Sequence, residues 1–177
     1  MNNDDAPLLY APISEASLHA FAAFTCGEEE WQTDLREFLL EDALAQFRGR
    51  FNVTTLFYTQ SREPVGFVTL SAAQVNRGDI DLERRAPYPV VPAVLIGRLG
   101  VDVTHQGRGR GQQILAFVRA WTMWLPVGCR VLALQVDVRN EGAFRFYERE
   151  GFGRAPIQPQ RNMQWMFFDL EARSEAD

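Results

Sequence analysis

The chain has 177 residues, of which 46% are hydrophobic and 12% aromatic, as expected for an ordinary globular protein with one sizeable core. Its net charge of -5 means that a nucleic-acid backbone or an anionic membrane is repelled unless its positive charges gather on one face. All 18 basic residues are arginines. The two cysteines, Cys26 and Cys129, show no metal-ligand spacing, so we expect neither a metal site nor a disulfide framework.

The N-terminal residues 1–5 lack the basic stretch of a signal peptide. No uncharged apolar run approaches the ~20 residues that a bilayer span requires. We therefore expect a cytoplasmic protein without membrane contact, with one domain over residues 1–172 and a short flexible tail over residues 173–177.

Two helices and a β-hairpin are predicted first along the chain. Apolar residues recur at intervals of three and four over residues 13–24 and 34–48, and Asp34 followed by Glu37 has the spacing of a capping box for the second helix. Residues 53–59 and 64–71 are rich in β-branched and aromatic side chains and are separated by four polar residues. They are therefore predicted to be two antiparallel strands.

The second half of the chain alternates between strands and helices. Prolines and charged residues predict a long surface loop over residues 77–92, which leads into an apolar strand over 93–101. We then expect a glycine-rich turn at 106–111, a helix to about residue 125, a strand at 131–138, a helix at 141–150 and a last strand at 164–170. This order indicates the α/β class with parallel strands in a mixed sheet.

The segment Gln106-Gly107-Arg108-Gly109-Arg110-Gly111 lies where a phosphate-binding loop has to lie, between a predicted strand and a predicted helix. Three alternating glycines let the backbone curl and aim its N–H groups inward, and the helix N-terminus adds the positive end of its dipole. Arg108 and Arg110 add full charges. The spacing is neither GxGxxG nor that of a P-loop, and a plain strand-to-helix turn with exposed arginines stays the alternative reading.

The turn also carries a resemblance. Gln106-x-x-Gly109-x-Gly111, preceded by Arg98-Leu99-Gly100-Val101-Asp102, resembles the acetyl-CoA-binding motif of GNAT acetyltransferases. This implies a GNAT fold with a central sheet of about six to seven strands, antiparallel at first and parallel around the cofactor cleft, flanked by helices. It implies that the turn holds the diphosphate of acetyl-CoA and the preceding strand its pantetheine arm, through Leu99, Gly100, Val101, Gln106, Gly107, Arg108, Gly109, Arg110 and Gly111.

A second motif follows in Asn140-x-x-Ala143-x-x-Phe146-Tyr147-Glu148-Arg149-x-Gly151-Phe152, which matches the second GNAT signature. Aminolysis of a thioester passes through an oxyanion and expels a thiolate, so the site needs hydrogen-bond donors and a proton source. We expect Tyr147 to be the general acid, Asn140 to bind the pantetheine amide, and Ala143 and Phe144 to line the channel. The alternative for Tyr147 is a core aromatic residue with its hydroxyl at the surface.

The acceptor is open at this point. Phe24-x-Cys26-Gly27, Trp31 with Leu35, and the loop 84–89 resemble GNAT toxins of toxin–antitoxin pairs, which implies acetylation of aminoacyl-tRNA. The acidic balance favours a small-molecule or peptide amine, which is our main expectation. Under the toxin reading the tRNA contacts are Arg77, Arg84, Arg85, Arg98, Arg108 and Arg110.

Three further questions stay open in the sequence. An α-amine titrates at about 8, so a water chain suffices as base, with Asp102 and Glu63 as weaker candidates. The protein is alternatively a non-catalytic acetyl-CoA-binding module or a purely structural domain. The apolar strand Trp165–Phe168 offers an edge through which a homodimer would pair, and burial of this strand in the core of one chain is the alternative.

Overall fold

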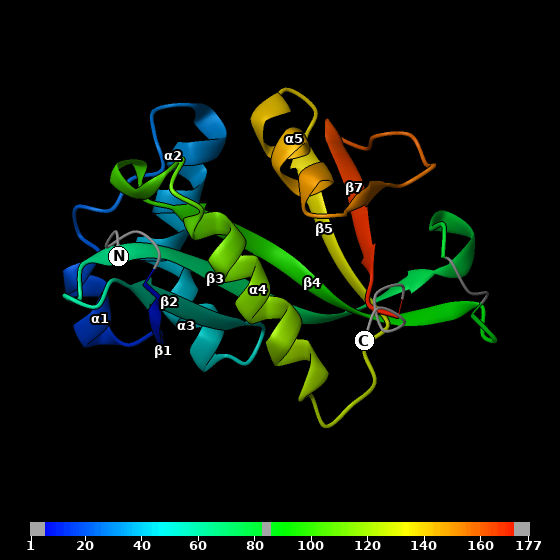
Figure 1. Ribbon diagram of the computed structural model, residues 1–177, viewed down its shortest axis with the longest axis horizontal. Coiled ribbons are helices and arrows are strands. Elements are labelled where there is room, and N and C mark those ends of the chain that lie inside the picture. The colour runs from blue at the N-terminus through cyan, green and yellow to red at the C-terminus, as the bar shows by residue number, and fades with distance from the viewer. Residues whose placement is uncertain (1–5, 83–85, 172–177) are drawn as a thin grey trace. The chain divides into compact units, whose positions relative to one another are not determined.

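The computed structural model describes residues 6–82 and 86–171 (Figure 1). Within them, seven strands form one mixed sheet in the order β1-β2-β3-β4-β5-β7-β6, which confirms the predicted α/β class. The strands are β1 (Leu9–Pro12), β2 (Val53–Tyr58), β3 (Pro64–Asn76), β4 (Val90–Val101), β5 (Val131–Asp137), β6 (Gly153–Arg154) and β7 (Met163–Asp169).

The predicted strand directions are confirmed. The hairpin β2–β3 is antiparallel, and β4 pairs with β5 in parallel over residues 93–95 and 131–133. The helices are α1 (Glu15–Ala20), α2 (Glu30–Glu37), a π-helix (Phe38–Asp42), α3 (Ala43–Arg48), 3-10 turns at Arg77–Asp79 and Val103–His105, α4 (Arg110–Met123) and α5 (Glu141–Arg149).

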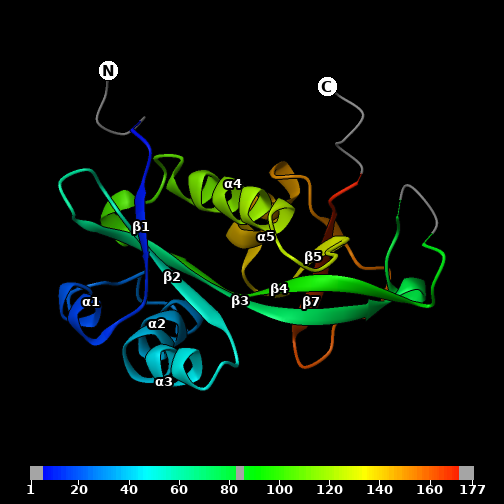
Figure 2. The ribbon, with the colours of Figure 1, turned by 90° about the horizontal axis from the view of Figure 1, so that it is seen from below.

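The chain divides into two compact units, which we describe separately. Unit 1 consists of residues 1–71 and 97–118, and unit 2 of residues 72–96 and 119–177. In unit 1, α1, α2 and α3 cover one face of β2 and β3, and the first part of α4 covers the other (Figure 2). The core between the sheet and α1–α3 is apolar and rich in aromatic rings, with Phe21, Phe24, Leu39, Leu56 and Phe67 at most 2% exposed.

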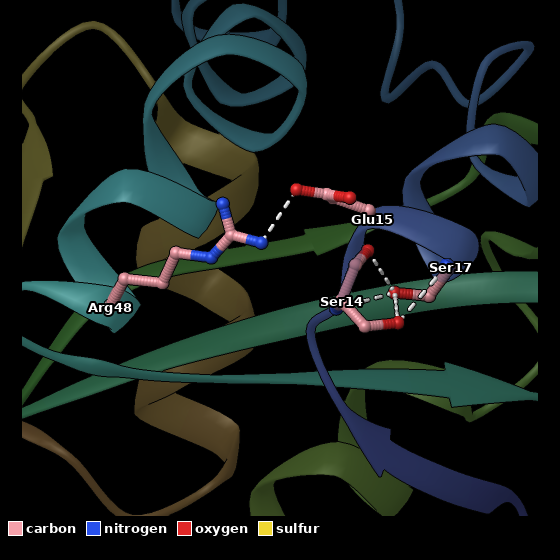
Figure 3. A network of polar contacts seen from close by, with 4 residues as sticks. All are labelled: Ser14, Glu15, Ser17 and Arg48. Atoms are coloured by element: carbon pink, nitrogen blue, oxygen red, sulfur yellow. Dashed lines mark hydrogen bonds and ion pairs between the residues drawn. The ribbon is translucent and has the colours of Figure 1, made fainter.

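Polar contacts fix the start of α1 (Figure 3). Ser14 caps the helix: its hydroxyl accepts from the N–H of Ser17 at 3.2 Å, and the Ser17 hydroxyl accepts from the N–H of Ser14 at 2.7 Å. Glu15 accepts from Arg48 of α3 at 2.6 Å, and this guanidinium lowers the pKa of Glu15. The first and last helices of the N-terminal layer are thus tied together at the surface.

The second predicted helix begins earlier than expected. The N–H of Glu29 donates to the side-chain oxygen of Gln32 at 3.0 Å, so the cap lies at Glu29. The predicted capping box of Asp34 and Glu37 is therefore wrong, because both residues lie inside α2. A π-turn follows, in which the N–H of Ala43 donates to the carbonyl of Phe38.

Unit 2 contains the parallel pair β4–β5, the strands β7 and β6, and α5, which packs on β5 and β7 (Figure 1). Arg130 holds Asp169 through two parallel hydrogen bonds of 2.7 and 2.8 Å across the β5–β7 edge. The proposed dimer edge is wrong as stated, because β7 is an inner strand: Met166 and Phe167 pair with β6 on one side and with β5 on the other.

Candidate functional site

The glycine-rich turn needs two of its three glycines for backbone geometry. Gly107 and Gly109 have φ values of 73° and 74°, in the left-handed region that favours glycine, whereas Gly111 lies in the first turn of α4. No heavy atom lies within 4 Å of a Cβ built on Gly107, and for Gly109 only the Gln112 Oε1, at 3.6 Å, does. The space beside both glycines is therefore open to an anion at the helix N-terminus.

The two arginines of the turn have different environments. Arg108 is exposed, whereas Arg110 is 3% exposed and donates from Nη1 to the carbonyl of Ala6 at 3.0 Å and to Gln113 Oε1 at 2.9 Å. The Arg110 side chain thus holds the N-terminal segment at Ala6 against α4. This side chain is therefore not an exposed charge for phosphate or tRNA, and the assignment of Arg110 to acetyl-CoA rests on its backbone N–H and stays a prediction.

The last residues of β4 lie close to their neighbours in unit 1. A Cβ on Gly66 would come 2.4 Å from the carbonyl oxygen of Gly100, and one on Gly100 would come 2.9 Å from Cys26 Sγ. Leu99 and Val101 are partly exposed at this strand end. Glycine at position 100 is required because β3, β4 and the loop before α2 meet here.

Gln106 was expected to serve the coenzyme, but its side chain points to protein carbonyls. Its Nε2 donates to the carbonyls of Cys26, at 2.8 Å, and Val101, at 3.0 Å. Nothing in the spacing of the motif indicates this role. Any direct contact of Gln106 with a diphosphate therefore falls to its backbone.

In unit 2, the turn between β5 and α5 is fixed by a carboxylate. Arg139 donates to Asp137 from Nε at 2.9 Å, from Nη2 at 2.6 Å and from its backbone N–H at 2.9 Å, and these bonds lower the pKa of Asp137 to about 2. Asn140 follows as the N-cap of α5, with its Oδ1 accepting from the N–H of Ala143 at 3.0 Å. The amide N–H₂ group is the part of Asn140 that this cap does not use.

The predicted channel residue Phe144 is 5% exposed, and the guanidinium of Arg154 lies 4.2 Å from its ring centre. Phe144 therefore lies on the buried face of α5, and its role in lining the coenzyme channel stays a prediction. Ala143 beside it is half-buried.

Tyr147 is half-buried between two aromatic rings, with Phe146 at 5.1 Å and Phe152 at 5.5 Å between ring centres, both edge-on. Burial raises the pKa of its phenol above the usual range. The hydroxyl therefore stays protonated at neutral pH. That is the state in which it can donate a proton to a leaving thiolate.

The two candidate bases differ in their surroundings. Asp102 is 8% exposed and accepts from the N–H of Thr25 at 3.1 Å and from the N–H and hydroxyl of Thr104 at 2.9 and 2.6 Å. Both carboxylate oxygens of Asp102 accept hydrogen bonds within the protein, so this residue has a structural role. Glu63 is an exposed residue of the β2–β3 turn.

The arginines expected to contact tRNA are distributed over both units. Arg98 is exposed, with its guanidinium 5.2 Å from the ring centre of Phe38. Arg77 donates to the carbonyl of Ala86 at 3.0 Å and so holds the loop before β4. Arg84 and Arg85 lie outside the described residues.

Among residues 6–82 and 86–171, no three or more His, Cys, Asp and Glu side chains are grouped as a metal site. Both cysteines are free thiols. In the same part of the chain, no helix has the length and apolar character needed to cross a membrane.

Comparisons with known proteins agree with the motifs. The model of the acetyltransferase (GNAT) family matches residues 18–152. The tRNA-acetylating toxin of Mycobacterium tuberculosis is 34% identical over 106 residues, which are 58% of this chain and 62% of that toxin. The match thus spans less than two thirds of the relative's length.

Two solved structures resemble almost the whole chain. A tyrosine-to-phenylalanine mutant of KacT has a TM-score of 0.78 and 26% identity, covering 97% of this chain and 100% of that one. A tyrosine-to-phenylalanine mutant of the AtaT toxin, bound to the C-terminus of the antitoxin AtaR and acetyl-CoA, has a TM-score of 0.67 and 26% identity over 94% of this chain and 96% of that one.

Proposed function

The chain belongs to the acetyltransferase (GNAT) family, and we propose that it moves the acetyl group of acetyl-CoA onto the α-amine of aminoacyl-tRNA. The observation that carries the choice of acceptor is the 34% identity to a tRNA-acetylating toxin. Family membership supports the coarser part of the proposal, an N-acetyltransferase with acetyl-CoA as co-substrate.

Unit 1 supplies the groups that bind the coenzyme. Gly107 and Gly109 have the left-handed backbone that lets successive N–H groups face one anion, and α4 begins directly after them at Arg110. A diphosphate at this place receives backbone hydrogen bonds and the positive end of the helix dipole. The exposed Arg108 adds a full charge.

The end of β4 supplies backbone groups for the pantetheine arm. The parallel register of β4 with β5 covers residues 93–95, and β4 runs on to Val101. We assign the peptide groups of Leu99 and Val101, in this later stretch, to the arm. The carbonyl of Val101 already accepts from Gln106, but a carbonyl oxygen has two lone pairs and can accept a second hydrogen bond.

Unit 2 supplies the proton. In the reaction, the amine nitrogen attacks the thioester carbon, the carbon–sulfur bond breaks, and the phenol of Tyr147 gives its proton to the sulfur. The amine loses a proton to water, and the Tyr147 phenolate takes up a proton from water to restore the phenol. Because an α-amine has a pKa of about 8, a sizeable fraction is neutral near pH 7 and no strong base is required. This is consistent with the structural engagement of Asp102.

A second candidate acceptor is a small-molecule or peptide amine. The net charge of -5 favours it, because a tRNA backbone is repelled by an acidic protein. Under the tRNA proposal, the exposed Arg98 and Arg108 of unit 1 must provide a local positive surface. The similarity to an AtaT mutant bound to the C-terminus of the antitoxin AtaR supports an antitoxin partner as part of the tRNA proposal.

The test is release of free thiol from acetyl-CoA when the protein is given charged tRNA, uncharged tRNA, or a panel of polyamines, amino acids, aminoglycosides and peptides. We expect turnover with charged tRNA alone. Turnover with a small amine but not with charged tRNA would move the protein to the second candidate. If acetyl-CoA binds and every acceptor fails, the protein is a non-catalytic module.

A further inference from the structure

In unit 1, the loop Phe24–Gly27 is fastened to the segment that leads into the glycine-rich turn. The N–H of Thr25 donates to Asp102 Oδ2 at 3.1 Å, and the N–H of Val103 donates back to the carbonyl of Thr25 at 2.8 Å. These bonds join residues far apart in sequence. The loop position and the path of the chain into the turn are therefore set together.

Gln106 is the second fastening, and it lies in the turn itself. Its one amide nitrogen bridges the carbonyls of Cys26 and Val101, at 2.8 and 3.0 Å. One side chain thus joins the loop, the end of β4 and the turn. A shift of the turn backbone at residue 106 must move the loop or break one of these bonds.

Asp102 is fixed in a way that suits this role. It is 8% exposed, with Oδ2 on the loop and Oδ1 on Thr104 in the 3-10 turn before Gln106. Because both oxygens are used inside the protein, Asp102 holds the loop without being available to a substrate. Removal of either partner would leave a buried polar group unsatisfied.

The far side of the loop is held differently. Arg36 of α2 donates from Nε to the carbonyl of Phe24 at 3.1 Å and from Nη2 to that of Ala22 at 3.4 Å. The side chain of Cys26 is 3% exposed and packs against Gly100 of β4. The loop therefore has a fixed edge at Arg36 and an edge at Gln106 and Asp102 that depends on the turn.

We propose that Gln106 and Asp102 are positioning residues that couple the coenzyme turn to the loop Phe24–Gly27, so that acetyl-CoA bound at the turn stabilises the loop in this position. The proposal rests on the proposed function in one respect, the binding of acetyl-CoA at the turn. Neither residue touches the reacting atoms. Their contribution is made through the backbone that they hold.

The rate at which Cys26 is alkylated measures the coupling between the turn and the loop. Burial, with a smaller contribution from the Asp102 charge, raises the pKa of its thiol to about 12, so Cys26 reacts with an alkylating agent only when the loop opens. The experiment follows iodoacetamide labelling of Cys26 by mass spectrometry in a Cys129→Ser background, with and without acetyl-CoA. We expect acetyl-CoA to slow labelling by about fivefold or more, since two hydrogen bonds of ordinary strength are held in place.

Three substitutions sharpen the test. Gln106→Ala is expected to speed labelling by about tenfold without ligand and to remove the effect of acetyl-CoA. Gln106→Arg, which retains N–H donors, is expected to restore the effect. Gln60→Ala is the matched control, because it removes a side-chain amide bond of the same kind, 2.6 Å to the carbonyl of Pro7, and should change neither rate.

The outcomes separate this proposal from the proposed function. Labelling of Cys26 that acetyl-CoA does not slow, in protein shown by calorimetry to bind it, would overturn the coupling and leave the function standing. Absence of acetyl-CoA binding would instead contradict the proposed function. If Gln106→Ala does not fold, labelling of Cys26 with and without acetyl-CoA in the protein that retains Gln106 still tests the coupling. In kinetics, coupling raises the KM for acetyl-CoA in Gln106→Ala more than it lowers kcat, whereas general destabilisation changes neither selectively.

Discussion

The turn of unit 1 and Tyr147 of unit 2 hold their predicted functional groups by different means. The turn is formed by the backbone, with two left-handed glycines, and is held by the buried Asp102 and by the side-chain amide of Gln106, which donates to the carbonyl of Cys26. Tyr147 is a single side chain held by edge-on aromatic packing. Changes in the first region should therefore alter affinity for the coenzyme, and a change in the second should alter the rate of the chemical step.

The largest effect is expected for Tyr147→Phe. Loss of the proton donor should lower kcat by about 10²–10⁴-fold, while the Kd for acetyl-CoA stays unchanged, because the ring and its packing remain. Thiol release and calorimetry measure the two quantities. Tyr88→Phe, which removes an exposed hydroxyl from the same unit, is the control. A normal rate for Tyr147→Phe would mean that another group protonates the thiolate.

A smaller effect, of the opposite kind, is expected for Gly109→Val. A β-branched residue at a φ of 74° is strained by about 1–3 kcal/mol, and its side chain enters the space assigned to the diphosphate. We expect the Kd for acetyl-CoA to rise at least about tenfold, which corresponds to ~1.4 kcal/mol. Gly128→Val is the matched control, since no protein atom lies within 4 Å of its Cβ position and its φ is not left-handed. Equal affinity in the two variants would remove the turn from the site.

The smallest effect is expected for pH, since kcat should stay constant as long as the phenol of Tyr147 is protonated. The raised pKa of Tyr147 keeps the phenol protonated further into the alkaline range than a free tyrosine, so its proton remains available as pH rises. We measure kcat with saturating substrates and correct it for spontaneous hydrolysis of the aminoacyl ester. Ionisation of Tyr147 should cause no decrease of kcat at any pH below about 10. A decline of kcat between about pH 8 and pH 9 would contradict a proton donor whose pKa is raised, as it is for Tyr147.

Local patterns were enough to predict the hairpin and the turn, which depend on residues close in sequence. The parallel pair joins distant residues, but the strand–helix–strand order predicted its direction. The missed strands have physical reasons. Strand β1 has four residues, ends in Pro12, and gains its order from antiparallel pairing with β2, more than forty positions later. Strand β6 has two residues and exists only through β7.

In the site too, features set by neighbouring residues were predictable and features set by distant residues were not. The left-handed glycines were predictable from the motif itself. The hydrogen bond of Arg110 to the carbonyl of Ala6 was not, and neither was that of Gln106 to the carbonyl of Cys26, because both partners are distant in sequence. The cap of α2 was misplaced because Glu29 is an unusual N-cap residue, whereas Asp34 is a favoured type.

The π-helix Phe38–Asp42 has a consequence for how this chain is aligned with other sequences. A π-turn is an α-helix that contains one additional residue, so the helical face after it is rotated relative to the face before it. Leu39 inside the π-helix and Ala43 directly after it are both fully buried. A homologue with an uninterrupted helix here would have the same buried positions and one residue fewer, and its alignment would need a single-residue gap within a helix.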